Sequence, residues 1–312
     1  MLETIINSLA FGLIAMVLVG GSWTLVGLVM GDAPKKGVDS SVVQFLGGFI
    51  PIIVGLIILS CQKYDFGLFS FKTLLLTNAC YLLGGFANFF MLENMSKAMQ
   101  RGPNGIIWSI IQSAMVFPFI VGIVFFGAAI NVFRIVGIIG LLTALVLFGM
   151  AKNNVSNGKS WKLLTFLGLA ICAFQQTIMT IPLFYEEARH ISSIHRTTMV
   201  AIGIVIAAIV LTLFKQRNGS CQKILDGIKN LQVWKYVLIL QGFNLFFAYI
   251  FLYPGMNVLG AKGLGGMCYP LLVGSCIIIF TLTSCLFLRE KLQKIQLIAL
   301  IFCILGLLFI CL

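Results

Sequence analysis

About ten long apolar stretches, separated by short polar breaks, fill nearly the whole of this 312-residue chain. They lie near residues 8–30, 42–61, 73–96, 103–126, 132–151, 162–185, 192–214, 233–256, 264–288 and 294–312. Each stretch is close to the roughly 20 residues that a helix needs to cross a bilayer. Spans of this kind fold as helices, because lipid offers the backbone no hydrogen-bond partner. The sequence therefore predicts an all-α polytopic membrane protein with ten transmembrane helices.

The composition excludes a soluble globule. Hydrophobic residues make up 60% of the chain and charged residues only 10%, whereas a soluble domain carries about a quarter of charged residues. No polar break is long enough to hold a folded soluble domain, so the spans themselves must carry the function. The expected location is the cell (inner or cytoplasmic) membrane, with multiple crossings and lipids as neighbours.

The net charge of +12 could indicate nucleic-acid binding, but its distribution favours membrane orientation instead. Under a ten-span count, six basic residues fall on one side of the membrane: Lys63, Lys72, Arg134, Arg189, Arg196 and Lys262. The other 15 of the 21 Lys and Arg fall on the opposite side. The positive-inside rule then places both termini outside the cytoplasm. We expect no nucleic-acid partner.

Two parts of the chain resemble each other. Residues 127–149 align with residues 289–311 at a constant offset of 162, and both are short connections that enter an apolar span. A fainter match at an offset of 156 pairs Phe11, Gly12, Leu13 and Thr24 with Leu167, Gly168, Leu169 and Thr180. The expected units are a first five-helix repeat at 1–152, a linker at 153–161 and a second five-helix repeat at 162–312. Because five is odd, the second repeat would cross the membrane in the opposite sense, and such inverted repeats are typical of transporters.

The end of the chain carries a more specific pattern. Tyr-Pro-Leu-Leu-Val-Gly begins at Tyr269, Phe-Leu-Arg-Glu-Lys-Leu follows, and Ile-Leu-Gly-Leu-Leu lies in the last span. This run resembles the closing half of an EamA-type repeat of the drug/metabolite transporter superfamily. In the first half Ala128 stands where Glu290 stands in the second, so the halves depart from each other.

The resemblance implies ten helices with peripheral fifth and tenth spans. It also implies a central cavity lined by the first, third and fourth spans of each half. The family's solutes include amino acids and related metabolites, sugars and drug-like compounds, with export favoured over uptake.

Polar residues inside the spans give candidate solute-binding positions. In the third span Asn78, Tyr81, Gly85 and Asn88 recur at steps of three and four residues, so they share one helical face. In the eighth span Gln241 and Asn244 repeat this spacing. A polar face on a membrane helix avoids lipid, and it either lines a cavity or forms hydrogen bonds that hold the bundle together.

Further candidates lie in the first, fourth and sixth spans. Trp23 follows a glycine pair in the first span, and Gln175 and Gln176 lie at the corresponding depth of the sixth. Trp108 and Gln112 are one turn apart in the fourth span. An aromatic plane beside an amide suits an amphipathic organic solute, although Trp108 could equally anchor its helix at the membrane interface.

Glu93 is the clearest acidic residue within a span, and a buried charge must be paired, hydrated or protonated. One interpretation makes Glu93 a coupling residue that binds a proton or a cationic solute. The alternative is a structural salt bridge with Lys97, one turn further along the helix.

Both histidines, His190 and His195, lie in a connection that also holds Glu186, Glu187, Arg189 and Arg196. Although these residue types can bind metal, their spacing favours a solvated loop between helices, and we expect no metal site. The glycines Gly137 and Gly140 could serve internal packing or a dimer face, so the oligomeric state stays open.

These features together predict a secondary active transporter that moves a small organic solute by alternating access. The chain has no phosphate-binding loop of the P-loop type, so a solute or proton gradient would supply the energy, and no cofactor is expected. No HExxH or GxSxG motif favours an enzyme. The alternatives are a non-transporting receptor or assembly subunit, and proton-coupled uptake.

Overall fold

The computed structural model describes residues 8–102, 104–128, 130–150, 160–214, 220–287 and 293–312, and every regular element in these ranges is helical. The helices are α2 (Leu9–Asp32), α3 (Ser40–Cys61), α4 (Phe71–Met99), α5 (Asn104–Gln112), α6 (Val116–Phe126), α7 (Val132–Met150), α8 (Ser160–Thr180), α9 (Glu186–Arg189), α10 (Ser193–Phe214), α11 (Ser220–Lys229), α12 (Leu231–Phe247), α13 (Tyr253–Ala261), α14 (Cys268–Phe287) and α15 (Lys294–Cys311). The predicted all-α class is confirmed for this part of the chain.

Two of the expected spans are interrupted. A short 3₁₀ turn, Ser113–Met115, separates α5 from α6, and a π-helical turn, Ala248–Leu252, separates α12 from α13. Pro254 lies in the first turn of α13, two residues after the end of the π turn, and a proline removes a backbone donor from the helix that it enters. The eighth span is therefore an irregular helix. π-helical turns inside α-helices are frequent at functional sites.

Polar caps fix where several helices begin. The Asp39 side chain accepts a hydrogen bond of 2.9 Å from the backbone N–H of Ser41 at the start of α3. Ser70 caps α4 by accepting from the N–H of Thr73 at 3.3 Å. At the start of α15, Gln293 and Gln296 form a reciprocal capping box. Each cap satisfies backbone donors that the first helical turn leaves unpaired.

Eight helical segments in the described ranges are long and apolar enough to cross a membrane. They are Leu9–Lys36, Ser40–Cys61, Phe71–Met99, Ile107–Phe126, Trp161–Phe184, Ser193–Phe214, Leu231–Ala261 and Lys294–Cys311. Two further apolar segments, Val132–Leu147 and Gly265–Ile279, are shorter. All ten coincide with stretches that the sequence predicts.

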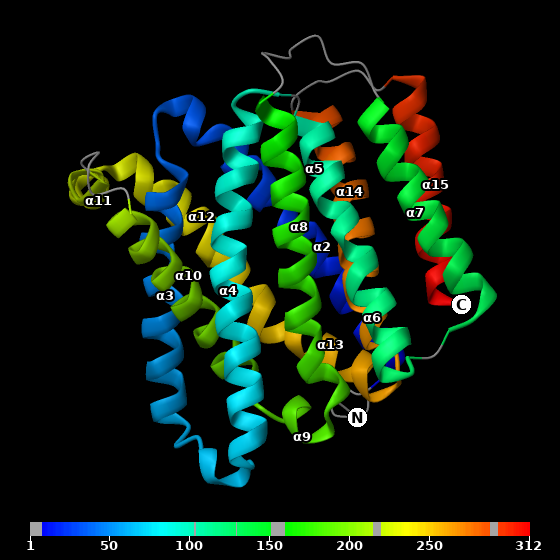
Figure 1. Ribbon diagram of the computed structural model, residues 1–312, viewed down its shortest axis with the longest axis horizontal. Coiled ribbons are helices and arrows are strands. Elements are labelled where there is room, and N and C mark those ends of the chain that lie inside the picture. Colours follow the sequence, from blue (N-terminus) through cyan, green and yellow to red (C-terminus); the bar gives the residue numbers. More distant parts are fainter. Residues whose placement is uncertain (1–7, 103, 129, 151–159, 215–219, 288–292) are drawn as a thin grey trace.

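The first and second parts of the chain interlock. Helix α4 packs against α8 and α10, α2 packs against α14, and α3 packs against α10. Helix α15 packs along α7, and this pair lies at one edge of the bundle (Figure 1). The peripheral placement of these two helices agrees with the family resemblance.

Glycines bring α7 and α15 together. A Cβ on Gly137 would lie 2.7 Å from the carbonyl oxygen of Gly306, and one on Gly140 would lie 3.3 Å from the Gly306 Cα. Such short distances require that the two backbones touch, as small residues allow between membrane helices. Gly137 and Gly140 therefore serve internal packing, which was one of their two predicted roles, the other being a dimer face.

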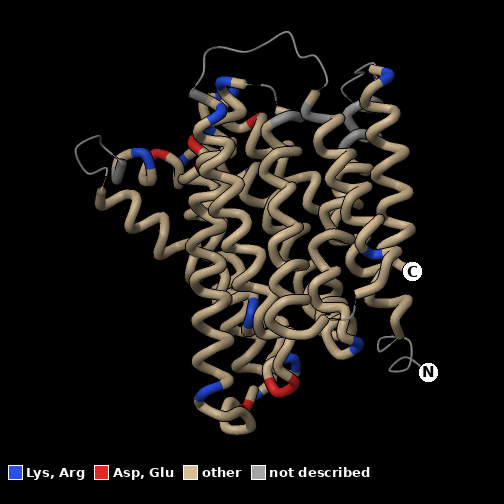
Figure 2. Tube along the Cα trace, turned by 45° about the vertical axis from the view of Figure 1, so that its right-hand side comes forward, with Lys and Arg blue, Asp and Glu red and all other residues tan. Residues whose placement is uncertain are grey.

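Most charged residues lie near the two ends of the bundle (Figure 2). Long apolar helices with charged ends are what a bilayer requires. The chain is therefore a multi-pass membrane protein. Most of the predicted linker at 153–161 lies outside the described residues, and its last two residues, Ser160 and Trp161, already belong to α8. Glu290 also lies outside the described ranges.

Candidate functional site

A cavity of about 190 Å³ lies in the bundle, lined by residues of α2, α3, α4, α5, α8, α10 and the segment from α12 to α13. Eight of the ten residues that the sequence proposed for solute binding line it: Trp23, Asn88, Trp108, Gln112, Gln175, Gln176, Gln241 and Asn244. These residues come from five separate predicted spans. The structure thus brings together positions that the sequence could only assign to individual helix faces.

Asn78 and Tyr81 lie elsewhere. The Asn78 side-chain oxygen is 2.6 Å from Nε2 of His195, so this amide joins α4 to α10. Tyr81 is fully buried behind the cavity and packs edge-to-face on Tyr253, with ring centroids 5.4 Å apart. Tyr253 itself lines the cavity. Tyr81 therefore supports the wall of the cavity and does not form its surface.

The helices around the cavity differ from those that the resemblance implied. Helices α3 and α10 contribute to its wall, whereas none of the described residues that line it comes from α14. Helix α14 packs against α2 instead: a Cβ on Gly20 would lie 2.3 Å from the carbonyl oxygen of Leu272. This close contact between the two backbones keeps α14 behind α2.

Several amides in the cavity wall lack hydrogen-bond partners. Both side-chain polar atoms of Gln44, Oε1 of Gln112 and Oε1 of Gln176 are buried without a partner. A buried amide without a hydrogen bond costs free energy, typically about 1–3 kcal/mol in proteins. A polar solute or water molecules in the cavity would supply the missing bonds. Gln44 was missed from the sequence, where the only signal was a single amide near the start of the second span.

The neighbouring glutamines of α8 are only weakly engaged. Nε2 of Gln175 lies 3.1 Å from the sulfur of Met179, and Nε2 of Gln176 lies 3.3 Å from the sulfur of Cys172. Sulfur is a weak acceptor, so these contacts hold the amides less firmly than oxygen would. The amides are consequently free to exchange such contacts for stronger bonds to a solute.

Trp108 is buried in the cavity wall and packs on α2. A Cβ on Gly27 would lie 3.0 Å from the Trp108 ring, so the absence of a side chain at Gly27 makes room for the indole. Trp23, which also lines the cavity, lies 6.3 Å from the ring of Tyr269 between centroids. Indole surfaces thus accompany the amides, a combination that suits an amphipathic solute.

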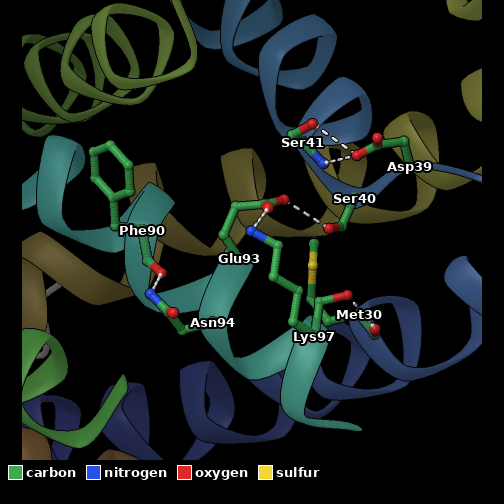
Figure 3. Close-up of polar contacts among 9 residues, drawn as sticks. Met30, Asp39, Ser40, Ser41, Phe90, Glu93, Asn94 and Lys97 are labelled. Carbon is green, nitrogen blue, oxygen red and sulfur yellow. Dashed lines mark hydrogen bonds and ion pairs between the residues drawn. The ribbon is translucent and has the colours of Figure 1, made fainter. Parts of the chain in front are cut away.

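The cavity wall is uncharged. Among the described residues that line it there is no Asp, Glu, Lys, Arg or His. Glu93 is outside this wall: its Oε1 accepts a hydrogen bond of 2.7 Å from Ser40, and its Oε2 lies 3.0 Å from Nζ of Lys97 (Figure 3). These contacts form the salt bridge that was one of the two interpretations of Glu93. The coupling role stays a prediction.

A buried arginine lies next to the cavity. Arg196 is 0% exposed, and its Nη2 donates to the carbonyl oxygens of Ala188 and Arg189 at 2.8 Å each. Its Nη1 donates to Asn257 of α13 at 2.8 Å. The guanidinium also faces the rings of Tyr81 and Tyr253, at 5.8 and 5.6 Å from the centroids. Arg196 thus ties α10 to α4, α9 and α13 beside Tyr253.

The expectation of a solvated loop at this place is wrong for His195 and Arg196. Helix α10 begins at Ser193, so both residues belong to its first turn, where His195 is only 4% exposed. Because α10 packs against α4, this turn is covered by the neighbouring helix. The sequence pattern showed charged residues together but not the helix that buries them.

Glu187 is expected to stabilise this end of the bundle in a pH-dependent manner. Its carboxylate accepts hydrogen bonds from the Ser70 N–H, from Oγ of Ser70 at 2.8 Å and from the Thr73 hydroxyl, at the start of α4. These donors lower the pKa of Glu187 below its ordinary value of 4.5. A lowered pKa contributes stability above pH 4.5 that is lost as the pH falls through the lowered value.

The Glu187→Gln variant should therefore lose stability at neutral pH and show a flatter dependence of Tm on pH between about 5 and 3 than the parent protein. Glu186→Gln is the matched control, because Glu186 makes none of these contacts. Thermal unfolding across this pH range measures the effect. Parallel pH profiles for Glu187→Gln and the parent protein would contradict the assignment.

Comparison with known proteins bears on the fold and on the family. A solved crystal structure superposes with a TM-score of 0.64 at 12% sequence identity, covering 96% of this chain and 94% of its own. At this identity the likeness concerns the fold alone. No curated protein matches the sequence. Residues 181–312 match the EamA-like transporter family, which belongs to the drug/metabolite transporter superfamily, and this match confirms the resemblance that the sequence pattern indicated.

Proposed function

We propose that this protein is a secondary active transporter that moves a small polar or amphipathic organic solute across the cell membrane by alternating access. The family match over residues 181–312 indicates a membrane transporter of the drug/metabolite type. The observation that carries the finer proposal is the uncharged cavity with unpaired amide atoms: both of those of Gln44, and Oε1 of Gln112 and of Gln176.

The proposal includes ten spans arranged as two inverted five-helix repeats, at 1–152 and 162–312. The eight long apolar segments support this count, together with the two shorter ones in α7 and α14. Helix α7 has 19 residues and α14 has 20, which is close to the length that a bilayer requires. The excess of basic residues at one end supports an orientation with both termini outside the cytoplasm.

The chemistry of the cavity supports a solute that offers hydrogen-bond donors and acceptors and carries no strong net charge. Amide side chains supply neutral donors and acceptors, and the indoles of Trp23 and Trp108 supply flat apolar surface. Amino-acid-like, sugar-like and drug-like compounds all meet this description. We favour export, on the resemblance to the family.

Polar contacts between helices at both ends of the cavity support the alternating-access mechanism. At one end Tyr236 donates to Asp32 at 2.6 Å, and Ser96 donates to the carbonyl oxygen of Met30 at 3.1 Å. At the other end lie the contacts of Arg196 and Glu187. Opening of one end would break its contacts while those at the opposite end hold, which is what transport by alternating access requires.

Thermal unfolding of the purified protein with amino acids, sugars, nucleosides and amphipathic drugs tests the proposal. A bound solute must raise the apparent stability of the folded state. For a solute that raises the stability, Gln112→Leu and Gln176→Leu should each raise the Kd by roughly tenfold, since a lost hydrogen bond costs about 1–1.5 kcal/mol. Each variant without solute should be as stable as the parent protein or more stable, because an unpaired buried amide oxygen is removed.

Gln232→Leu is the matched control, because Gln232 is exposed at the start of α12, away from the cavity. It should bind the solute as the parent protein does. Uptake into proteoliposomes then separates transport from simple binding: a solute that binds but is never moved would support the receptor alternative. If no solute class stabilises a folded sample, the cavity does not have the proposed role.

A further inference from the structure

Helix α11 differs from the spans in its direction and its surface. It lies at the periphery of the bundle, at the end where α12 begins, and it runs across the direction of the neighbouring spans (Figure 1). Its main contacts are with α3 and α12. A short helix in this position lies where the surface of the bilayer is expected.

One face of α11 is fixed to the bundle by Gly227. A Cβ on Gly227 would lie 2.4 Å from Cγ1 of Val42, so only glycine allows this close approach to α3. Ile224 is partly buried at the same contact. The indole N–H of Trp234 donates to the carbonyl oxygen of Ile228 at 2.8 Å, which ties the end of α11 to α12. The orientation of α11 is thereby determined.

In this orientation several apolar side chains of α11 and of the start of α12 are exposed. Leu225 is 53% exposed, Ile228 is 47% exposed, and Leu231 just after the helix is 84% exposed. At 3.6 residues per turn, Ile224, Leu225 and Ile228 form one continuous apolar arc. The exposed side chains of Gln222, Lys223, Asp226 and Lys229 form the polar face of the helix. A small helix with such a division is typical of segments that lie in the membrane interface.

The charges around this arc are predominantly basic. Lys223 and Lys229 border the polar face, Lys235 follows in α12, and all three are exposed. None of these lysines forms a salt bridge with any residue in the described ranges. Asp226 is engaged by Gln222, whose Nε2 donates to it at 3.0 Å. Lysines beside exposed apolar residues can keep their ammonium groups at the level of lipid headgroups.

We propose that α11 and the start of α12 bind anionic phospholipids. Leu225, Ile228 and Leu231 would enter the acyl-chain boundary, and Lys223, Lys229 and Lys235 would contact the phosphate-bearing headgroups. The combination of basic side chains with an apolar arc favours lipid over a soluble protein partner, because an anionic leaflet attracts each basic residue near its surface. Trp234 beside them is a residue type enriched at this interface.

Thermal unfolding of the full chain in neutral detergent, with added phosphatidylglycerol or phosphatidylcholine, tests this proposal. We expect phosphatidylglycerol to raise the Tm more than phosphatidylcholine does, and high salt to remove the difference. The combined variant Lys223→Gln, Lys229→Gln and Lys235→Gln should lose at least half of that lipid-specific shift. A control that replaces Lys63, Lys72 and Lys262 by Gln removes three exposed lysines from the opposite end and should keep the shift.

Three outcomes would overturn the proposal. The variant that lacks Lys223, Lys229 and Lys235 could keep the full lipid-specific shift in Tm, the control variant could lose as much of that shift, or both lipids could raise the Tm equally. Leu225→Ser with Ile228→Ser provides a second test, because the loss of the apolar arc should weaken the response to phosphatidylglycerol while all lysines stay in place. Both tests measure lipid binding in the absence of solute. Their outcome is therefore independent of whether the central cavity binds or transports a solute.

Discussion

Replacing Arg196 with glutamine should lower the free energy of unfolding by about 3 kcal/mol, one of the two largest effects that we expect. The guanidinium donates to the carbonyl oxygens of Ala188 and Arg189 and to Asn257, each at 2.8 Å, in a fully buried position. Removing the guanidinium leaves Asn257 Oδ1 without this donor, whereas the carbonyl oxygens of Ala188 and Arg189 keep bonds from the Ile191 N–H and from Nδ2 of Asn257. A hydrogen bond to a charged group contributes about 1.5–3 kcal/mol. Thermal or denaturant unfolding in detergent measures the loss.

Two further variants distinguish this role from a general effect of charge. Arg196→Lys keeps the charge, but a lysine ammonium lacks the planar guanidinium geometry that reaches three acceptors. The stability of this variant should therefore lie between those of the parent protein and of Arg196→Gln. Arg189→Gln removes a partly exposed arginine whose guanidinium donates to the carbonyl oxygen of Leu183 at 3.0 Å. It should cost much less. Equal stability of Arg196→Gln and the parent protein would contradict the structure.

Gly85→Ala should destabilise the protein by about 2 kcal/mol, in the range typical of overpacked interiors. Helices α4 and α10 touch through glycines on both sides. A Cβ on Gly85 would lie 2.0 Å from the carbonyl oxygen of Val200, and one on Gly203 would lie 2.1 Å from that of Leu82. A methyl group at either place must push the two helices apart. Because both helices line the cavity, solute binding should weaken as well.

Gly242→Ala is the matched control for this prediction, because Gly242 lies within α12 and a Cβ there would have no heavy atom within 4 Å. It should leave stability unchanged or raise it by up to about 1 kcal/mol, as alanine favours helix more than glycine does. Unfolding curves of the two variants, recorded in the same detergent, decide the matter. Equal stabilities would show that α4 and α10 are not in contact through Gly85.

The helices themselves could be predicted from the sequence to within a few residues. The stretch expected at 42–61 is the helix Ser40–Cys61, and the stretch expected at 192–214 is Ser193–Phe214. Long apolar runs admit few alternatives in lipid, because only a helix satisfies its own backbone. The π turn Ala248–Leu252 was not predicted, since the sequence there continues the same apolar pattern.

The cavity could be predicted in part. The amides of α8 and α12 were recognised because a polar side chain inside an apolar span is conspicuous. Asn78 and Tyr81 share a helical face with Asn88, yet only Asn88 lines the cavity, because α10 covers the beginning of that face through His195 and Arg196. The spacing of residues in the sequence shows which of them share a helical face, but not which other helix, if any, covers each part of that face.

The sequence by itself determined that this chain is helical and crosses the membrane several times, because the lengths of its apolar runs and its low charge content leave no other stable arrangement in lipid. Only the tertiary structure decided which polar residues face a cavity and which hold helices together. Gln44 and Arg196 show the reason: one amide in an apolar span and one arginine in a charged connection look unremarkable in sequence. Contacts between helices far apart in the chain leave the first unpaired in the cavity wall and bury the second among backbone carbonyls.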